Sequence, residues 1–252
     1  MEWNKSMNEK IYCRIRRVRA VFLTFFLTAA VVLTDAQNIR EKEYEKTEII
    51  YCIGDSITYG SGLEDEERLT KSYPAQLGIR LGPRYLIFNY GVRGATLQDL
   101  SRKSYRNMGY LNVIEAQSPD VVIIMLGTND CKTVFGVTAS DIARGTMALI
   151  RAVRAFPWTN AAPCPRILLM APIKIKPQIA DVYMTDFDER SVEASEHFAE
   201  YYAHVAEQFG CDFLNAAEFA EPGDIDYLHM MPESHESLGH AVAAKLQEML
   251  GE

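Results

Sequence analysis

Cysteine, glycine and proline are all scarce in this chain of 252 residues, which contains 5, 15 and 10 of them. So little glycine and proline excludes a collagen-like or low-complexity protein. Four cysteines follow the first 36 residues, and no two of them have C-x-x-C spacing, so neither a zinc site nor a thioredoxin-like site is indicated. A chain of this length can bury enough surface to fold without disulfides or metal.

Basic residues are also in deficit. The sequence has 26 Lys and Arg against 34 Asp and Glu, a formal net charge of -8 and a pI of about 5.3. A nucleic-acid partner normally requires a basic face, so we expect none. Hydrophobic residues make up 48% and aromatic residues 10%, which excludes intrinsic disorder. The five histidines form no H-E-x-x-H pattern, and we expect neither a metal nor a cofactor.

No apolar run is long enough to cross a bilayer as a helix. The uncharged run at residues 20–34 has 15 residues, whereas a span requires about 20. Residues 1–36 carry a net charge of +3, so the remaining 216 residues carry -11. A positive segment, an apolar run and a Thr34-x-Ala36 ending fit a secretory signal peptide cleaved near Ala36.

Three alternatives for this leader remain open: an uncleaved membrane anchor, a start at Met7, and an amphipathic helix packed on the domain. We therefore expect a signal peptide or anchor at residues 1–36, a short linker at 37–47 and one domain at 48–252. The expected location is secreted or extracytoplasmic. Membrane contact is expected only through an uncleaved leader, and nothing in the sequence indicates an oligomeric state.

Beyond the leader, short apolar runs alternate with longer stretches of helical periodicity. The expected strands are Ile49–Ile53, Tyr85–Tyr90, Val121–Leu126, Ile167–Ala171 and Asp212–Leu214. The expected helices are Ser140–Phe156, Asp188–Phe209 and Glu233–Leu250. This alternation predicts a parallel sheet with helices on both faces, a three-layer α/β/α sandwich. Ligands of such sheets bind beyond the carboxyl ends of the strands.

Unusual polar segments occur at those strand ends. They are Gly54–Thr58 (GDSIT), Asn89–Gly94 (NYGVRG), Gly127–Asp130 (GTND) and Asp226–His229 (DYLH). Each follows one of the expected strands, so the fold should bring all four to the same edge of the sheet.

Acyl transfer requires the residue types that these segments contain. A serine hydroxyl needs a base to accept its proton, and a third group to orient that base. Ser56 can be the nucleophile, His229 the base and Asp226 the orienting acid. The tetrahedral oxyanion needs preorganised donors, which the backbone N–H groups of Ser56 and Gly94 and the side-chain amide of Asn129 can supply.

Each of these residues also has a purely structural interpretation. The alternatives are a helix cap for Ser56, turn glycines at Gly91 and Gly94, an Asx turn at Asn129, a cap at Asp130 and a solvated loop for His229. Their order along the chain, each after a strand, favours the catalytic interpretation of the set.

The four segments resemble blocks I, II, III and V of the SGNH (GDSL) hydrolase superfamily, over about residues 48–250. The sequence is most similar to the arylesterase and acyltransferase branch, and NYGVRGATL is similar to the carbohydrate-deacetylating members. The resemblance implies a flavodoxin-like five-stranded sheet in the order 2-1-3-4-5, and it implies the same roles for Ser56, Gly94, Asn129, Asp226 and His229. The chain departs from many members by having Tyr-Leu between its DYLH acid and base, where they have Gly-Ile.

We therefore expect a serine esterase that hydrolyses short, acetyl-type O-acyl esters through an acyl-serine intermediate, with glycan or small-molecule esters as substrates. Acyl transfer to an alcohol acceptor and a non-catalytic carbohydrate-binding protein on the same fold are the alternatives. A flavodoxin-like nucleotide binder would need a glycine-rich phosphate loop after the first strand, where Asp55 places a carboxylate instead.

Several neighbouring residues have two interpretations. The loop Lys174–Phe187 and the pair Met230 and Met231 either wall the substrate pocket or pack into the core. His197 and His204 are expected on the solvent-exposed face of their helix. The acidic run at residues 64–67 is expected to be a solvated loop.

Overall fold

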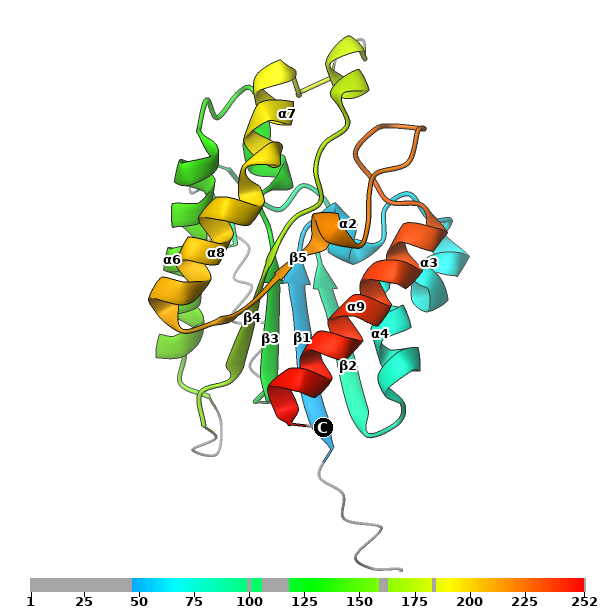
Figure 1. The fold of residues 1–252 in the computed structure, drawn as a ribbon, viewed down its shortest axis with the longest axis vertical. Coiled ribbons are helices and arrows are strands. Elements are labelled where there is room, and N and C mark those ends of the chain that lie inside the picture. The colour runs from blue at the N-terminus through cyan, green and yellow to red at the C-terminus, as the bar shows by residue number, and fades with distance from the viewer. Residues whose placement is uncertain (1–46, 99–100, 106–117, 159–162, 183–184, 252) are drawn as a thin grey trace, which may run out of the picture. The chain divides into compact units, whose positions relative to one another are not determined.

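Five parallel strands form the centre of the computed structural model (Figure 1). The structure describes residues 47–98, 101–105, 118–158, 163–182 and 185–251. The expected leader at residues 1–36 and all but the last residue of the expected linker lie outside these ranges. Among the helices that are described, none has both the length and the apolar character needed to span a membrane.

All five expected strands are confirmed, in the order β2-β1-β3-β4-β5. Their bounds are Glu48–Gly54 for β1, Tyr85–Gly91 for β2, Val121–Met125 for β3, Arg166–Ala171 for β4 and Asp212–Asn215 for β5. The register pairs Gly54 with Gly91 on one side and with Met125 on the other. The strands β1, β2 and β3 therefore end at the same level, and the polar segments that follow them begin side by side.

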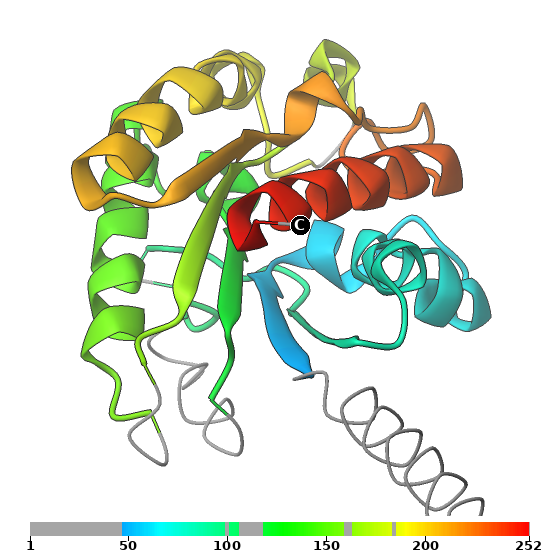
Figure 2. The same ribbon diagram turned by 60° about the horizontal axis from the view of Figure 1, so that its bottom comes forward.

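Helices cover both faces of the sheet (Figure 2). The helices α6 (Ala139–Ala155) and α8 (Phe198–Phe209) pack on one face, and α4 (Tyr73–Leu81) and α9 (Pro232–Leu250) on the other. Apolar side chains form one buried cluster on each face. All five residues of β3 are buried, as a strand covered on both faces requires. The predicted three-layer α/β/α sandwich is thus confirmed.

Helix α6 begins with a capping box. The Thr138 hydroxyl accepts a hydrogen bond from the Asp141 N–H at 3.2 Å, and the Asp141 carboxylate accepts one from the Thr138 N–H at 3.0 Å. Two orphan donors at the start of the helix are satisfied in this way.

The expected single helix over residues 188–209 is in fact two helices. α7 (Glu189–Glu196) ends at His197, where φ is −96° and ψ is 0°, and α8 begins at the next residue. The Ser195 hydroxyl donates to the Val192 carbonyl at 2.7 Å and accepts from the Ile175 N–H at 2.9 Å. Such a bond from serine to a carbonyl of the preceding turn bends helices, which accounts for a break at this point.

Some helices were not expected from the sequence. The acidic run at residues 64–67 leads into α3 (Asp65–Lys71), and carboxylates in a first turn complement the positive end of the helix dipole. The prediction of a loop there is therefore wrong, although the run is exposed to solvent as expected. Short elements complete the fold at α2 (Ser56–Tyr59), η2 (Thr128–Cys131), η4 (Pro177–Asp181) and η5 (Ala216–Glu218).

Candidate active site

Ser56 is the first residue of α2, and only Asp55 separates it from the end of β1. The Asp55 carboxylate accepts a hydrogen bond from the Ile57 N–H at 2.9 Å and thereby caps this helix. The interpretation of Ser56 as the helix cap is therefore wrong, and its hydroxyl is available for another partner. Ser56 is only 7% exposed, so few water molecules compete for that hydroxyl.

Glycine at the end of β2 allows α2 to lie against the sheet. A Cβ atom added to Gly91 would lie 2.1 Å from the backbone nitrogen of Tyr59, closer than any two such atoms can approach. The amide of Asn89 donates to the Thr58 carbonyl at 2.8 Å and further fixes the two segments. The position of the Ser56 turn therefore depends on a residue without a side chain in the neighbouring strand.

His229 lies between Ser56 and Asp226. Its Nε2 atom is 2.9 Å from the Ser56 Oγ atom, and its Nδ1 atom is 2.6 Å from the Asp226 Oδ2 atom. With the proton on Nδ1 held by the carboxylate, Nε2 can accept a proton from the serine. The structure thus brings together the three residues that the sequence singles out, and His229 is not a solvated loop residue.

The Asp226–His229 loop is closed by the aspartate itself. Its Oδ1 atom accepts hydrogen bonds from the N–H groups of Leu228 at 3.0 Å and of His229 at 2.8 Å. Tyr227, which lies between Asp226 and Leu228, has φ of 61°, the only positive φ of a non-glycine residue in the described part of the chain. Glycine adopts this conformation without strain, which explains why a Gly-Ile pair suits this loop better than Tyr-Leu.

The pKa of Asp226 is held well below its ordinary range. Burial alone would raise it, but hydrogen bonds from the His229 ring and from the N–H groups of His229 and Leu228 outweigh that effect. Asp226 is therefore an ionised acceptor at neutral pH. The other nearby acid, Asp224, is bound elsewhere: its Oδ1 atom lies 2.7 Å from the Lys176 Nζ atom.

Gly94 and Asn129 lie in segments that are bound to each other. The Asn129 side-chain amide donates to the Ala95 carbonyl at 3.2 Å, and the Val92 N–H donates to the Gly54 carbonyl at 3.0 Å. These bonds connect the loop after β2 both to η2 and to the end of β1, directly before the Ser56 turn. Gly94 has φ of 78°, a left-handed conformation that favours glycine.

Asp130 also holds the loop after β2. Its carboxylate accepts hydrogen bonds from the N–H groups of Leu97 at 2.9 Å and of Gln98 at 3.0 Å. The sequence predicts at most a helix cap at Asp130, whereas its partners lie more than thirty residues earlier. Burial raises the pKa of Asp130 to about 7, and burial also raises the pKa of Asp55 to about 6.

His235 is a buried residue that sequence reasoning did not single out. It is fully buried in α9, and its Nδ1 atom accepts a hydrogen bond from the Tyr73 N–H at 3.2 Å, which joins α9 to the start of α4. Burial lowers the pKa of His235 to about 4. Sequence patterns such as an i, i+4 pair or a helix cap reveal only contacts between nearby residues. His235 and Tyr73 are 162 residues apart, so no such pattern could indicate this contact.

The loop after β4 and the methionine pair after His229, which the sequence places either at the substrate pocket or in the core, pack mostly into the core. Met230 is fully buried under α9, and Ile175, Ile179 and Phe187 of the loop after β4 are buried in the other apolar cluster. His197 and His204 are exposed, as predicted. Within the part of the chain that the structure describes, no three His, Cys, Asp or Glu side chains are grouped to hold a metal ion.

The family model of GDSL-like lipases and acylhydrolases matches residues 52–237 of this chain. The chain therefore belongs to the GDSL-like lipase/acylhydrolase family, which places it among the carboxylic ester hydrolases. The resemblance to this superfamily seen in the sequence is confirmed.

A curated relative is an acetylxylan esterase from Xylanibacter ruminicola. It is 31% identical over 218 residues, which are 79% of this chain and 43% of the relative. The chain thus spans less than half the length of that protein.

Solved structures share the fold. One that is 63% identical has a TM-score of 0.75 and covers 82% of this chain and 100% of its own. A carbohydrate acetylesterase family member from Sinorhizobium meliloti is 26% identical, with a TM-score of 0.73 and coverage of 81% and 100%. An aryl esterase from M. smegmatis, 24% identical, has a TM-score of 0.71 and coverage of 80% and 99%.

Proposed function

We propose that this chain is a serine esterase that hydrolyses short, acetyl-type O-acyl esters through an acyl-Ser56 intermediate. One observation carries the proposal, the continuous hydrogen-bonded chain from Ser56 through His229 to Asp226, with distances of 2.9 and 2.6 Å. A nucleophile, a base and an orienting acid in this geometry are what acyl transfer from an ester requires.

The chemistry follows from these positions. As Ser56 Oγ attacks the ester carbonyl, His229 Nε2 accepts the hydroxyl proton, and the ionised Asp226 stabilises the imidazolium. His229 then donates that proton to the departing alcohol, leaving the acyl group on the serine. A water molecule, deprotonated by the same Nε2 atom, attacks the acyl-serine, the bond from the acyl carbon to Ser56 Oγ breaks, and Nε2 returns the proton to that oxygen as the carboxylic acid leaves.

Three donors are proposed to bind the oxyanion. The Ser56 N–H is at the first position of α2, where N–H groups have no intrahelical partner. The Asn129 amide has two hydrogens, and the bond to the Ala95 carbonyl uses one of them. The Gly94 N–H belongs to the loop that this bond holds. Such donors act mainly on the charge that develops in the transition state.

Acetylated glycans are the proposed natural substrates. An acetylxylan esterase and a carbohydrate acetylesterase family member are among the relatives, which supports this choice. Hydrolysis is favoured over transfer to an alcohol because water can reach the base that would deprotonate it: the His229 side chain is 19% exposed and its Asp226 partner 46%. A non-catalytic carbohydrate-binding role is disfavoured by the intact hydrogen-bonded chain.

The proposal is tested with a series of p-nitrophenyl esters from acetate to palmitate and with acetylated xylan, each assayed for the parent and for Ser56→Ala. We expect rates that fall with acyl length, acetate release from xylan, and no release above background by the variant. Equal rates for acetate and palmitate would contradict the short-chain preference. Activity that persists in Ser56→Ala would contradict the mechanism.

We also propose that the leader exports the protein and is removed. Its support is the basic segment, the 15-residue apolar run and the Thr34-x-Ala36 ending. Mass spectrometry of the exported protein should find an N-terminus near Gln37. A full-length product in the membrane fraction would instead identify an uncleaved anchor, and one in the cytoplasm would refute export.

A further inference from the structure

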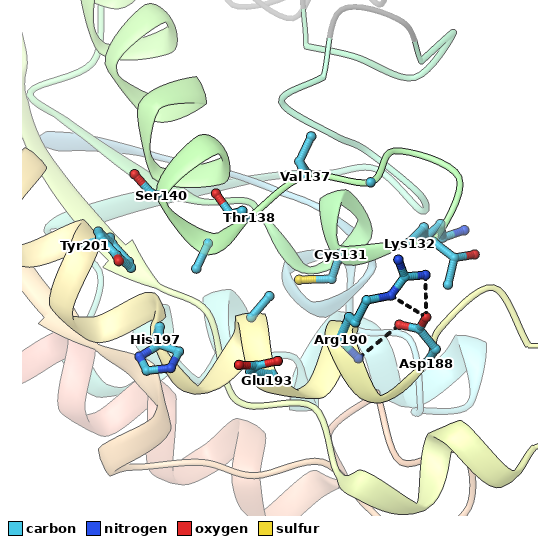
Figure 3. A pocket seen from close by; sticks show the side chains of 14 residues that line it. Cys131, Lys132, Val137, Thr138, Ser140, Asp188, Arg190, Glu193, His197 and Tyr201 are labelled. Atoms are coloured by element: carbon cyan, nitrogen blue, oxygen red, sulfur yellow. Dashed lines mark hydrogen bonds and ion pairs between the residues drawn. The ribbon is translucent and has the colours of Figure 1, made fainter.

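A cleft lies beside η2, and none of the proposed catalytic residues lines it. It has a volume of about 450 Å³ and is lined by side chains from residues 131–140 and 188–201. Figure 3 shows Thr138 and Ser140 on one wall, Glu193 and His197 on the opposite wall, and Tyr201 at one end. A concave site of this size is large enough for a small ligand or one unit of a polymer.

The charges of the cleft disfavour an anionic ligand. Its two cations are already paired, since Lys132 lies 3.0 Å from Asp186 and Arg190 lies 2.7 Å from Asp188 (Figure 3 draws the second pair). The Glu193 carboxylate has neither a hydrogen bond nor an ion pair within the described ranges. The uncompensated charge is therefore negative, and a phosphate or a carboxylate would be repelled.

The free polar groups of the cleft suit hydroxyl groups. Besides the Glu193 carboxylate, the hydroxyls of Ser140 and Tyr201 have no hydrogen-bond partner among the residues that the structure describes. One acceptor and two groups that both donate and accept match the mixed donor and acceptor character of sugar hydroxyls. The Tyr201 ring and the side chain of Val137 supply apolar surface for the C–H face of a sugar ring.

The cleft is close along the chain to the proposed oxyanion donor. Cys131 lines it and follows Asn129 by two residues in η2. The Ser191 hydroxyl donates to the Cys131 carbonyl at 2.6 Å and holds α7 against this turn. The cleft and the proposed oxyanion donor Asn129 thus share the short element η2.

We propose that this cleft is a saccharide subsite that binds a neutral sugar unit of a glycan whose acetylated unit lies at Ser56. The inference rests on the proposed esterase function for its biological meaning. Binding in the cleft itself does not require catalysis, so the two can be tested separately.

Binding is measured by titrating xylotetraose into Ser56→Ala protein and into the same protein carrying Glu193→Gln or Tyr201→Ala. The loss of a hydrogen bond to a charged group should weaken binding about tenfold. Glu207→Gln, on the exposed side of α8, is the matched control and should bind as the parent does. Xylotetraose that binds equally to all four proteins, or to none, would overturn the subsite.

Turnover gives the second measurement. For Glu193→Gln and Tyr201→Ala, the ratio of kcat/KM on acetylated xylo-oligosaccharides to kcat/KM on p-nitrophenyl acetate should fall about tenfold, because the small ester cannot reach the cleft. An unchanged ratio in both variants would overturn the subsite and leave the esterase proposal intact. Absence of ester hydrolysis by the parent, together with binding that Tyr201→Ala abolishes, would refute the esterase and support the subsite.

Discussion

The side-chain amide of Asn129 donates a hydrogen bond to the carbonyl oxygen of Ala95, 3.2 Å away. The next residue, Asp130, accepts hydrogen bonds from the N–H groups of Leu97 and Gln98 in the same loop. Two adjacent residues after β3 therefore hold the loop after β2, one by donating and one by accepting. Gly94 directly precedes the bound carbonyl, so the proposed oxyanion donors are positioned by one network.

Asn129→Ala should lower kcat on p-nitrophenyl acetate by roughly 10²–10³, with a smaller change in KM, because the amide is proposed to contact the oxyanion more strongly than the ground-state carbonyl. Steady-state kinetics measures the two constants separately. Asn215→Ala, at the end of β5, should change kcat little. A rise in KM at constant kcat for Asn129→Ala would make this amide a substrate-binding group instead.

Asp226→Asn should lower kcat by up to about 10⁴, because an amide at this position favours the wrong tautomer of the base. Asp224→Asn is the matched control. The Asp224 carboxylate is paired with Lys176 at the surface, with a side chain that is 87% exposed, and the change should alter kcat less than twofold, as expected for a weak exposed pair. Equal losses in the two variants would mean that the loop is not arranged as described.

The sequence was sufficient to predict the sheet and the three residues of the hydrogen-bonded chain. Apolar strand runs can be recognised locally, and Ser56, Asp226 and His229 each follow an expected strand, so the fold class places them at the same edge of the sheet. The break at His197 was not predictable, because it depends on Ser195 binding a loop 20 residues away. The partners of Asp130 and His235 were missed for the same reason, since only tertiary structure brings them together.

His235→Ala should destabilise the fold by about 2–4 kcal/mol, because it leaves a cavity and removes the acceptor of the buried Tyr73 N–H. Urea denaturation gives the free energy of unfolding. His240→Ala, at an exposed position of the same helix, should stay within about 0.5 kcal/mol of the parent. Similar free energies of unfolding for the His235 and His240 variants would show that His235 does not join α9 to α4.

Asp130→Asn should become more stable relative to the parent as the pH rises from about 4 to about 7. Burial raises the pKa of Asp130 to about 7, so the folded parent binds a proton more tightly than the unfolded chain, and this stabilisation is lost through that interval. The asparagine does not titrate. The difference in unfolding free energy should therefore change by at most about 1.4 kcal/mol per pH unit.

Asp141→Asn is the control with the opposite sign. Hydrogen bonds from the Thr138 side chain and backbone lower the pKa of Asp141, so its stabilisation is present at neutral pH and is lost as the pH falls. The free energy of unfolding of this variant should therefore fall further below that of the parent as the pH rises. A pH-independent difference for Asp130→Asn would show that the buried carboxyl does not titrate in this interval.

The most direct test of the account is covalent labelling of the nucleophile with a serine-directed phosphonate, followed by peptide mass spectrometry. The hydroxyl of Ser56, 2.9 Å from the His229 Nε2 atom, is the one activated serine that the mechanism uses. We expect one adduct per chain, located at Ser56, with loss of esterase activity in proportion to labelling and no adduct in Ser56→Ala. An adduct at another residue, or a labelled enzyme that keeps its activity, would contradict the acyl-Ser56 mechanism.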